Sequence, residues 1–150
     1  TAYRRQRQMC IRDRPKTINK EKILNFIKNK QIPIVVPLGV GDDGKIYNIN
    51  ADVAAGSIAK EIDARRLLLM TDVEGVLDEN QKLISEINLN RANEMLKNNI
   101  ISGGMIPKIN TCLDAISNGV RGVVIVDGRK PHSILFELFS DKGAGTLIRK

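Results

Sequence analysis

The chain has 150 residues, of which 42% are hydrophobic, and it carries a formal net charge of +7. A chain of this length buries roughly two thirds of its unfolded surface, so we expect one compact domain. No apolar run reaches the roughly eighteen residues of a membrane span. Aromatic residues make up only 3% of the chain, and five of the basic residues lie in residues 1–14. Neither a membrane nor a nucleic-acid partner is therefore expected.

The amino-terminal residues and the two cysteines indicate the setting of the protein. Residues 1–14 are basic and lack periodicity, so we interpret them as a disordered or non-native extension. A basic arm that binds an acidic partner is the alternative. Cys10 and Cys112 are far apart and have no CxxC or histidine-rich neighbours. This pattern favours a reducing, cytoplasmic environment.

The first half of the remaining chain alternates between helix and strand patterns. Apolar residues at helical spacing predict an amphipathic helix over 19–30, with an asparagine as its cap. The β-branched run 32–38 predicts a central strand that is buried on both faces. A tight turn at 43–44 predicts a hairpin with the alternating segment 45–49. An alanine-rich helix is expected to begin at Asp52.

The second half repeats this alternation and decides the fold class. A polar turn over 78–81 lies between apolar arms. The strongest patterns predict strands at 67–70, 123–126 and 145–148, and helices at 90–98, 105–118 and 131–139. Strands that alternate with helices predict an α/β fold with a mainly parallel sheet. Ligands of such folds gather at the carboxyl ends of the strands.

Residues 48–52 form a polar cluster where a strand gives way to a helix. Amides there can bind a ligand carboxylate, and the helix amino terminus favours anions. The alternative is a capping cluster in which Asn50 or Asp52 accepts hydrogen bonds from the helix. The residues alone favour the cap. The GxGxxG match at 39–44 is followed by a strand pattern rather than a helix, so we interpret it as a hairpin turn.

Two further segments could take part in a ligand site. Lys108 is expected in the first turn of a helix, just after two glycines, where it opposes the positive end of the helix dipole. It therefore either points into solvent or faces an anion such as phosphate. Residues 71–76 follow a buried strand at the edge where α/β folds bind ligands, although a plain loop explains them equally well.

Several segments, in order and at matching spacing, resemble acetylglutamate kinases of the amino-acid kinase family. They lie at 32–44, 47–55, 68–77 and 101–110. The stretch from Val126-Asp127-Gly128-Arg129 through 132–135 to 145–148 is similar to the arginine-inhibited branch of that family. The resemblance covers 15–150, and it identifies this region as the carboxyl-terminal, nucleotide-binding part of an amino-acid kinase domain.

The resemblance implies a three-layer αβα sandwich with a mainly parallel sheet. It also implies transfer of the γ-phosphoryl group of ATP to the side-chain carboxylate of N-acetyl-L-glutamate in arginine biosynthesis, with Mg²⁺ carried by the nucleotide. By position, Lys108 and Asp52 would be catalytic, and Asn48 and Asn50 would bind substrate. The nucleotide-binding residues would be Asp72, Val73, Glu74, Gly75, Val76, Leu77, Ile100, Ile101 and Ser102.

The resemblance also implies regulation by L-arginine. Glu137 and Gly143 match residues of the arginine site. Val124 stands where many sensitive relatives have a histidine, and the helix that joins their hexamers has no counterpart here. We therefore expect arginine inhibition to be weakened or lost, and we expect a homo-oligomer for a full-length protein.

The family's remaining active-site parts have no match in this chain. These are a lysine on a glycine-rich phosphate loop, a second glycine pair and an arginine that clamps the substrate carboxylate. We therefore expect the chain alone to be inactive. Two alternatives are a kinase of a related carboxylate, such as an aminoadipate derivative, and a non-catalytic module that binds nucleotide or arginine.

Overall fold

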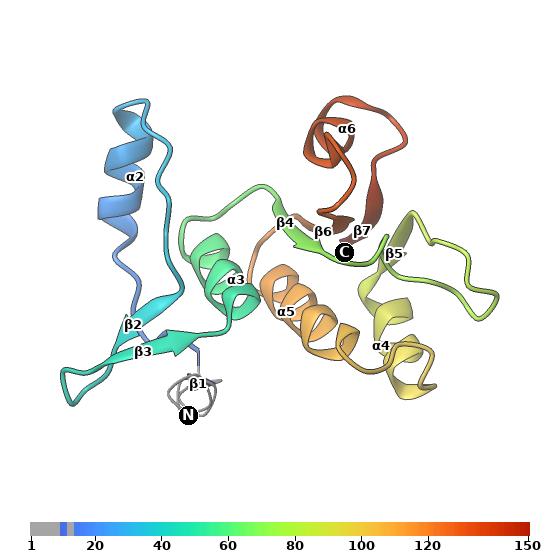
Figure 1. Cartoon of the computed structure of the whole chain (residues 1–150), viewed down its shortest axis with the longest axis horizontal. Coiled ribbons are helices and arrows are strands. Elements are labelled where there is room, and N and C mark those ends of the chain that lie inside the picture. Colours follow the sequence, from blue (N-terminus) through green and yellow to red (C-terminus); the bar gives the residue numbers. More distant parts are fainter. Residues whose placement is uncertain (1–9, 12–13) are drawn as a thin grey trace. The chain divides into compact units, whose positions relative to one another are not determined.

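A computed structural model describes residues 10, 11 and 14–150. The chain divides into two units, unit 1 over 1–63 and unit 2 over 64–150, each with its own sheet (Figure 1). The predicted extension over 1–14 lies mainly outside the described residues and stays a prediction. Within it, Cys10–Ile11 form the short strand β1.

The first helix of unit 1 is α2 (Lys20–Lys28), and it confirms the predicted amphipathic helix. The side chain of Asn19 accepts a hydrogen bond from the backbone N–H of Lys22 at 2.9 Å. This bond satisfies one of the free amides at the helix start, which explains why the helix begins there.

The predicted hairpin is present in unit 1. Strands β2 (Leu38–Val40) and β3 (Ile46–Ile49) pair antiparallel, and β1 pairs parallel with the outer side of β3. In the turn, Asp43 accepts hydrogen bonds from the hydroxyl of Tyr47 at 2.8 Å and from the N–H of Lys45 at 3.1 Å. These hydrogen bonds, of which that from Tyr47 has the larger effect, hold the pKa of Asp43 below its ordinary value. The GxGxxG match is therefore a hairpin turn, as predicted.

The predicted central strand over 32–38 is wrong. Residues 32–36 form neither helix nor strand, and only the last residue of the range belongs to β2. Ile32 and Ile34 are 91% and 94% exposed. Pro33 and Pro37 interrupt the run, and because proline has no N–H, it cannot donate to a sheet from the middle of a strand.

The last element of unit 1 is α3 (Ala51–Glu61), the predicted alanine-rich helix. Its buried residues are small, namely Ala54, Gly56, Ser57 and Ala59.

Among the described residues of the whole chain, no helix is long and apolar enough to cross a membrane.

Unit 2 is built on a four-stranded sheet with the order β4-β6-β7-β5. The β4–β6 and β5–β7 pairs are parallel, whereas β6 and β7 are antiparallel. The strands are β4 (Leu67–Thr71), β5 (Glu86–Asn88), β6 (Gly122–Asp127) and β7 (Gly145–Arg149). Two of the three pairs are parallel, so the predicted α/β fold with a mainly parallel sheet is confirmed.

Helices lie on both sides of this sheet. Figure 1 shows α4 (Leu89–Lys97) and α5 (Met105–Ser117) on one side and α6 (Ser133–Phe139) on the other. All residues of β6 are buried. The apolar stripe predicted for α5 is buried at Ile109, Cys112 and Ile116. The hydrophobic core of unit 2 therefore lies around the inner strand β6.

Candidate functional site

The predicted substrate and catalytic residues of unit 1 lie where β3 passes into α3. Asn48 is exposed on β3, Asn50 is the cap of α3, and Asp52 lies in the first helical turn. The Oδ1 atom of Asn50 accepts a hydrogen bond from the N–H of Val53 at 3.2 Å. The capping role of Asn50 is therefore confirmed. This cap uses only the side-chain oxygen, so the amide NH₂ can still donate to a carboxylate.

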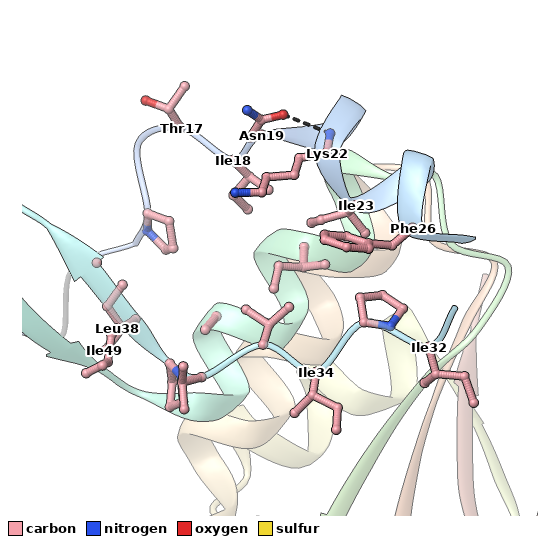
Figure 2. Close-up of a pocket in the computed structure, with 18 of the residues that line it drawn as sticks. Thr17, Ile18, Asn19, Lys22, Ile23, Phe26, Ile32, Ile34, Leu38 and Ile49 are labelled. Carbon is pink, nitrogen blue, oxygen red and sulfur yellow. Dashed lines mark hydrogen bonds between the residues drawn. The ribbon is translucent and has the colours of Figure 1, made fainter. Parts of the chain in front are cut away.

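An open apolar groove of about 560 Å³ lies elsewhere in unit 1. Figure 2 shows Ile23 and Phe26 of α2 on its wall, and Leu38 and Ile49 at its hairpin end. Asn48, Asn50 and Asp52 do not line this groove. The polar cluster and the apolar groove are therefore separate features of unit 1.

The predicted nucleotide-binding segment 72–77 begins at the carboxyl edge of the unit 2 sheet. Thr71 ends β4 and is in register with Asp127, which ends the parallel neighbour β6. The N–H of Gly128 donates to the carbonyl oxygen of Thr71 at 2.8 Å. The loops that follow these two parallel strands therefore begin side by side at the carboxyl edge of the sheet. This edge is the usual position of a ligand site in an α/β fold.

Asp127 and Arg129 form an ion pair at this edge. The side chain of Asp127 is only 4% exposed. Its Oδ1 accepts from the N–H and Nε of Arg129 at 2.9 and 3.0 Å, and its Oδ2 accepts from Nη2 at 3.0 Å. These bonds lower the pKa of Asp127 to about 2. The candidate set from the sequence did not include this pair, although a charged Asp-Gly-Arg string directly after a strand is a signal that could have indicated it.

A second ion pair joins the two loops at the same edge. Lys130 donates to Glu74 at 2.5 Å, and both side chains are about half exposed. Because a pair in water contributes little to stability, this contact orders the loop over 72–77 only weakly. A buried hydrogen bond holds the other end of the loop, where the N–H of Val76 donates to Oγ1 of Thr146 at 2.8 Å.

The remaining predicted nucleotide-site residues and Lys108 flank the start of α5. Ile101 is buried, Ile100 is half-buried and Ser102 is exposed. Lys108 is half-buried in the first turn of α5. The cap residue of this helix is Gly104, which has no side chain to accept a hydrogen bond from the helix amides. The amino end of α5 therefore combines helix amides with a lysine, a combination that attracts phosphate.

A smaller pocket of about 370 Å³ lies beside Ile100 in unit 2. Its lining includes four charged residues, namely Asp78, Glu79, Arg91 and Glu94. Nowhere in the described part of the chain do three or more His, Cys, Asp or Glu side chains form a group that could hold a metal ion.

The predicted arginine-site residues lie side by side in unit 2. The side chain of Glu137 is 7% exposed and accepts from Nη1 of Arg66 at 3.3 Å and from the N–H of Ala144 at 2.9 Å. Gly143 has a φ of 67°, and a Cβ there would lie 2.8 Å from Oε2 of Glu137. Sequence reasoning missed Arg66, which is remote from Glu137 along the chain.

These positions form two groups, one in each unit. Asn48, Asn50 and Asp52 lie together in unit 1, whereas the segments 72–77 and 100–102 and Lys108 belong to unit 2. Each group combines polar side chains with the end of a strand or the start of a helix. An α/β sheet of this kind, with charged loops at its strand ends, is characteristic of enzymes that bind anionic ligands.

The sequence assigns the chain to a family. Residues 6–127 match the model of the amino acid kinase family. The chain therefore belongs to the amino acid kinase family, which confirms the resemblance found in the sequence.

Individual relatives make the likeness more specific. The chain is 55% identical over all 150 residues to the acetylglutamate kinase of Pelagibacter ubique (strain HTCC1062) and spans 52% of that protein. It is 49% identical over 135 residues to the acetylglutamate kinase of Rhodospirillum rubrum, covering 90% of this chain and 44% of the relative. The chain thus spans about half the length of these relatives.

A solved structure supports the fold. N-acetylglutamate synthase from Neisseria gonorrhoeae, complexed with coenzyme A and L-arginine, matches with a TM-score of 0.84 and 25% identity. The match covers 90% of this chain and 31% of that one. The predicted amino-acid kinase-like fold is therefore confirmed for the part of the domain that this chain contains.

Proposed function

We propose that this chain supplies the nucleotide-binding part of an acetylglutamate kinase. The reaction transfers the γ-phosphoryl group of ATP to a side-chain carboxylate oxygen of N-acetyl-L-glutamate, which gives an acyl phosphate and ADP. The observation that carries the proposal is the 55% identity to an acetylglutamate kinase, which extends over the full 150 residues. The relatives are about twice as long, so the proposal concerns a share of the active site.

Unit 2 would bind the nucleotide. The loop over 72–77 and the segment 100–102 would contact ATP, with the positive amino end of α5 and Lys108 near the phosphates. Phosphoryl transfer depends on positioning and on neutralising charge, so the Lys108 ammonium group would stabilise the transferring phosphoryl group. Mg²⁺, carried by the nucleotide, would neutralise part of the phosphate charge.

Unit 1 would supply groups for the acceptor. Asn48 is exposed, and the NH₂ group of Asn50 does not take part in its cap, so both amides can donate to a substrate carboxylate. Asp52, in the first turn of α3, would orient lysine side chains around the phosphoryl group.

A calorimetric titration with ATP tests the nucleotide assignment. We expect the wild-type chain to bind ATP and Lys108→Ala to bind it about tenfold to a hundredfold more weakly, as for the loss of one charged hydrogen bond. Lys97→Ala is the matched control, because Lys97 is an exposed lysine in the last turn of α4. No binding by the wild-type chain, or equal binding by wild type and Lys108→Ala, contradicts the assignment.

Competition separates the proposed acceptor from the alternative. Acetylglutamate and an acetylated aminoadipate differ by one methylene group, and such a difference is typically worth about 1–3 kcal/mol in a fitted pocket. Acetylglutamate should therefore compete more strongly for the chain in the presence of ATP. Stronger competition by the aminoadipate derivative favours the alternative kinase.

L-arginine is a second candidate ligand. The related synthase structure contains L-arginine, and Glu137 and Gly143 are in contact here. Binding of a free guanidinium group at Glu137 should raise the Tm of the chain, because a ligand of the native state stabilises it. Glu137→Gln should remove this shift, whereas Glu79→Gln, a change at an exposed position, should keep it. A shift that persists in Glu137→Gln contradicts this site.

A further inference from the structure

One buried hydroxyl group connects β7 to the loop of the proposed nucleotide site. Thr146 of β7 is 0% exposed. Its Oγ1 accepts a hydrogen bond from the N–H of Val76 at 2.8 Å and donates one to the carbonyl oxygen of Ile84 at 2.6 Å. Both partners are main-chain atoms from the two sides of the polar turn over 78–81.

The same segment closes on itself at this point. The N–H of Ile84 donates to the carbonyl oxygen of Val76 at 2.9 Å, and Leu77 and Leu83 form an antiparallel bridge. Thr146 therefore binds the base of a small hairpin, and the loop over 72–77 leads directly into that base. The buried hydroxyl group of Thr146 therefore fixes the position of the loop at Val76.

Gly75 allows this close approach. Its φ is 152°, and a Cβ at this position would lie 2.5 Å from Oγ1 of Thr146. Any side chain at Gly75 would therefore displace the loop from the hydroxyl group. The glycine and the threonine form one complementary contact, with the loop backbone packed directly against β7.

Sheet packing alone does not require a hydroxyl group at this position. Valine has nearly the shape of threonine and suits a buried strand without the cost of desolvating an O–H group. The hydroxyl of Thr146 recovers that cost only through its two hydrogen bonds to the hairpin base. Its specific contribution is therefore to the position of the loop.

We propose that Thr146 is a positioning residue of the nucleotide site, which holds the loop over 72–77 in its binding conformation through the Val76 N–H and the Ile84 carbonyl group. This inference rests on the proposed function, because it assigns nucleotide binding to that loop. Thr146 itself, buried beneath the loop, acts only through the main chain.

The test compares two substitutions and two measurements. Thr146→Val keeps the shape and removes both hydrogen bonds, whereas Thr146→Ser keeps the hydroxyl group. We expect Thr146→Val to accelerate amide hydrogen exchange at Val76 about tenfold relative to the amides of β6, and to weaken ATP binding by a similar factor. Thr146→Ser should keep both values near wild type. Thr146→Ala replaces Thr146→Val if the latter does not fold.

A matched control separates local order from stability. Val123→Ala leaves a cavity at the amino end of β6, opposite the loop, and should destabilise unit 2 without changing the relative exchange at Val76. Wild-type ATP affinity in Thr146→Val, or unchanged exchange at Val76, overturns the inference while the proposed function stands. Absence of ATP binding in the wild-type chain overturns the proposed function itself, and the inference with it.

Discussion

At the scale of single residues, the clearest electrostatic feature is Asp127 at the end of β6. This carboxylate is almost buried, yet it is held ionised by Arg129 through three hydrogen bonds of 2.9–3.0 Å. Its pKa in the folded protein is about 2, below the ordinary 3.8. A carboxyl group with a lowered folded pKa stabilises the native state above its unfolded pKa and loses that contribution as the pH falls through the folded value.

Arg129→Gln should therefore lower the free energy of unfolding at neutral pH. The difference from wild type should shrink as the pH falls from about 4 to about 2, because Asp127 then becomes protonated in both proteins. Urea unfolding across this pH range measures the effect. Arg149→Gln breaks an exposed pair with Glu86 and serves as the control, with an expected loss of about 0–1 kcal/mol. Equal losses in both variants at neutral pH contradict the prediction.

Local sequence could predict some of these residues and not others. The cap at Asn50 follows from a polar residue before a helical pattern, and the structure confirms it. The Arg66–Glu137 contact joins residues 71 positions apart, so no local pattern indicates it. The bonds of Thr146 to Val76 and Ile84 are also formed only when distant segments meet. Side-chain partners of this kind depend on the tertiary fold.

At the scale of elements, asparagine caps begin three of the helices that the structure describes. In α2, α3 and α4 the side-chain oxygen of an asparagine accepts from the N–H three residues further on. Asn88→Ala removes this bond from α4 and should cost about 1 kcal/mol of stability. In a unit of the size of unit 2, which contains α4, this loss lowers the Tm by roughly 4–8 °C. Thermal unfolding followed by circular dichroism measures the change.

Asn90→Ala is the matched control, because Asn90 is exposed within the same helix. Alanine has the higher helix propensity, so this variant should be as stable as wild type or slightly more stable. A loss in Asn90→Ala equal to that in Asn88→Ala shows that the asparagine at the cap has no special role.

The strand predictions show when β-branched runs are informative. The runs at 32–38 and 123–126 look alike in composition, yet only the second forms a buried strand. The first run contains two prolines, which remove donors from any sheet ladder. The second run contains no proline and pairs with strands on both sides. Proline positions, rather than apolar content, distinguish the two segments.

At the scale of the whole molecule, the alternation of patterns predicted the fold class but not the arrangement of strands. β7 enters the sheet antiparallel to β6 and between β6 and β5, although it is the last strand in the chain. Its period and composition carry no information on direction. The division into two units at residue 63 was also not predicted, because a single alternating pattern runs across it.

The proposed division of the active site leads to a prediction for the chain as a whole. The chain spans 52% of the acetylglutamate kinase of Pelagibacter ubique, and the family's glycine-rich phosphate loop and carboxylate-clamping arginine have no match in its sequence. A site without these groups loses both charge stabilisation and substrate positioning, each of which is typically worth several kcal/mol of transition-state binding. Under the proposed function, the ATP site of unit 2 is retained.

We therefore expect ATP binding without acetylglutamate-dependent turnover. A coupled assay of ADP release, with and without acetylglutamate, measures turnover, and the full-length Pelagibacter ubique enzyme is the positive control. ADP release by the chain at the rate of that control would contradict this expectation and show that the chain suffices for catalysis. Binding without release is the expected result, because in the proposed function Lys108 supplies only one of the charges that stabilise a transferring phosphoryl group.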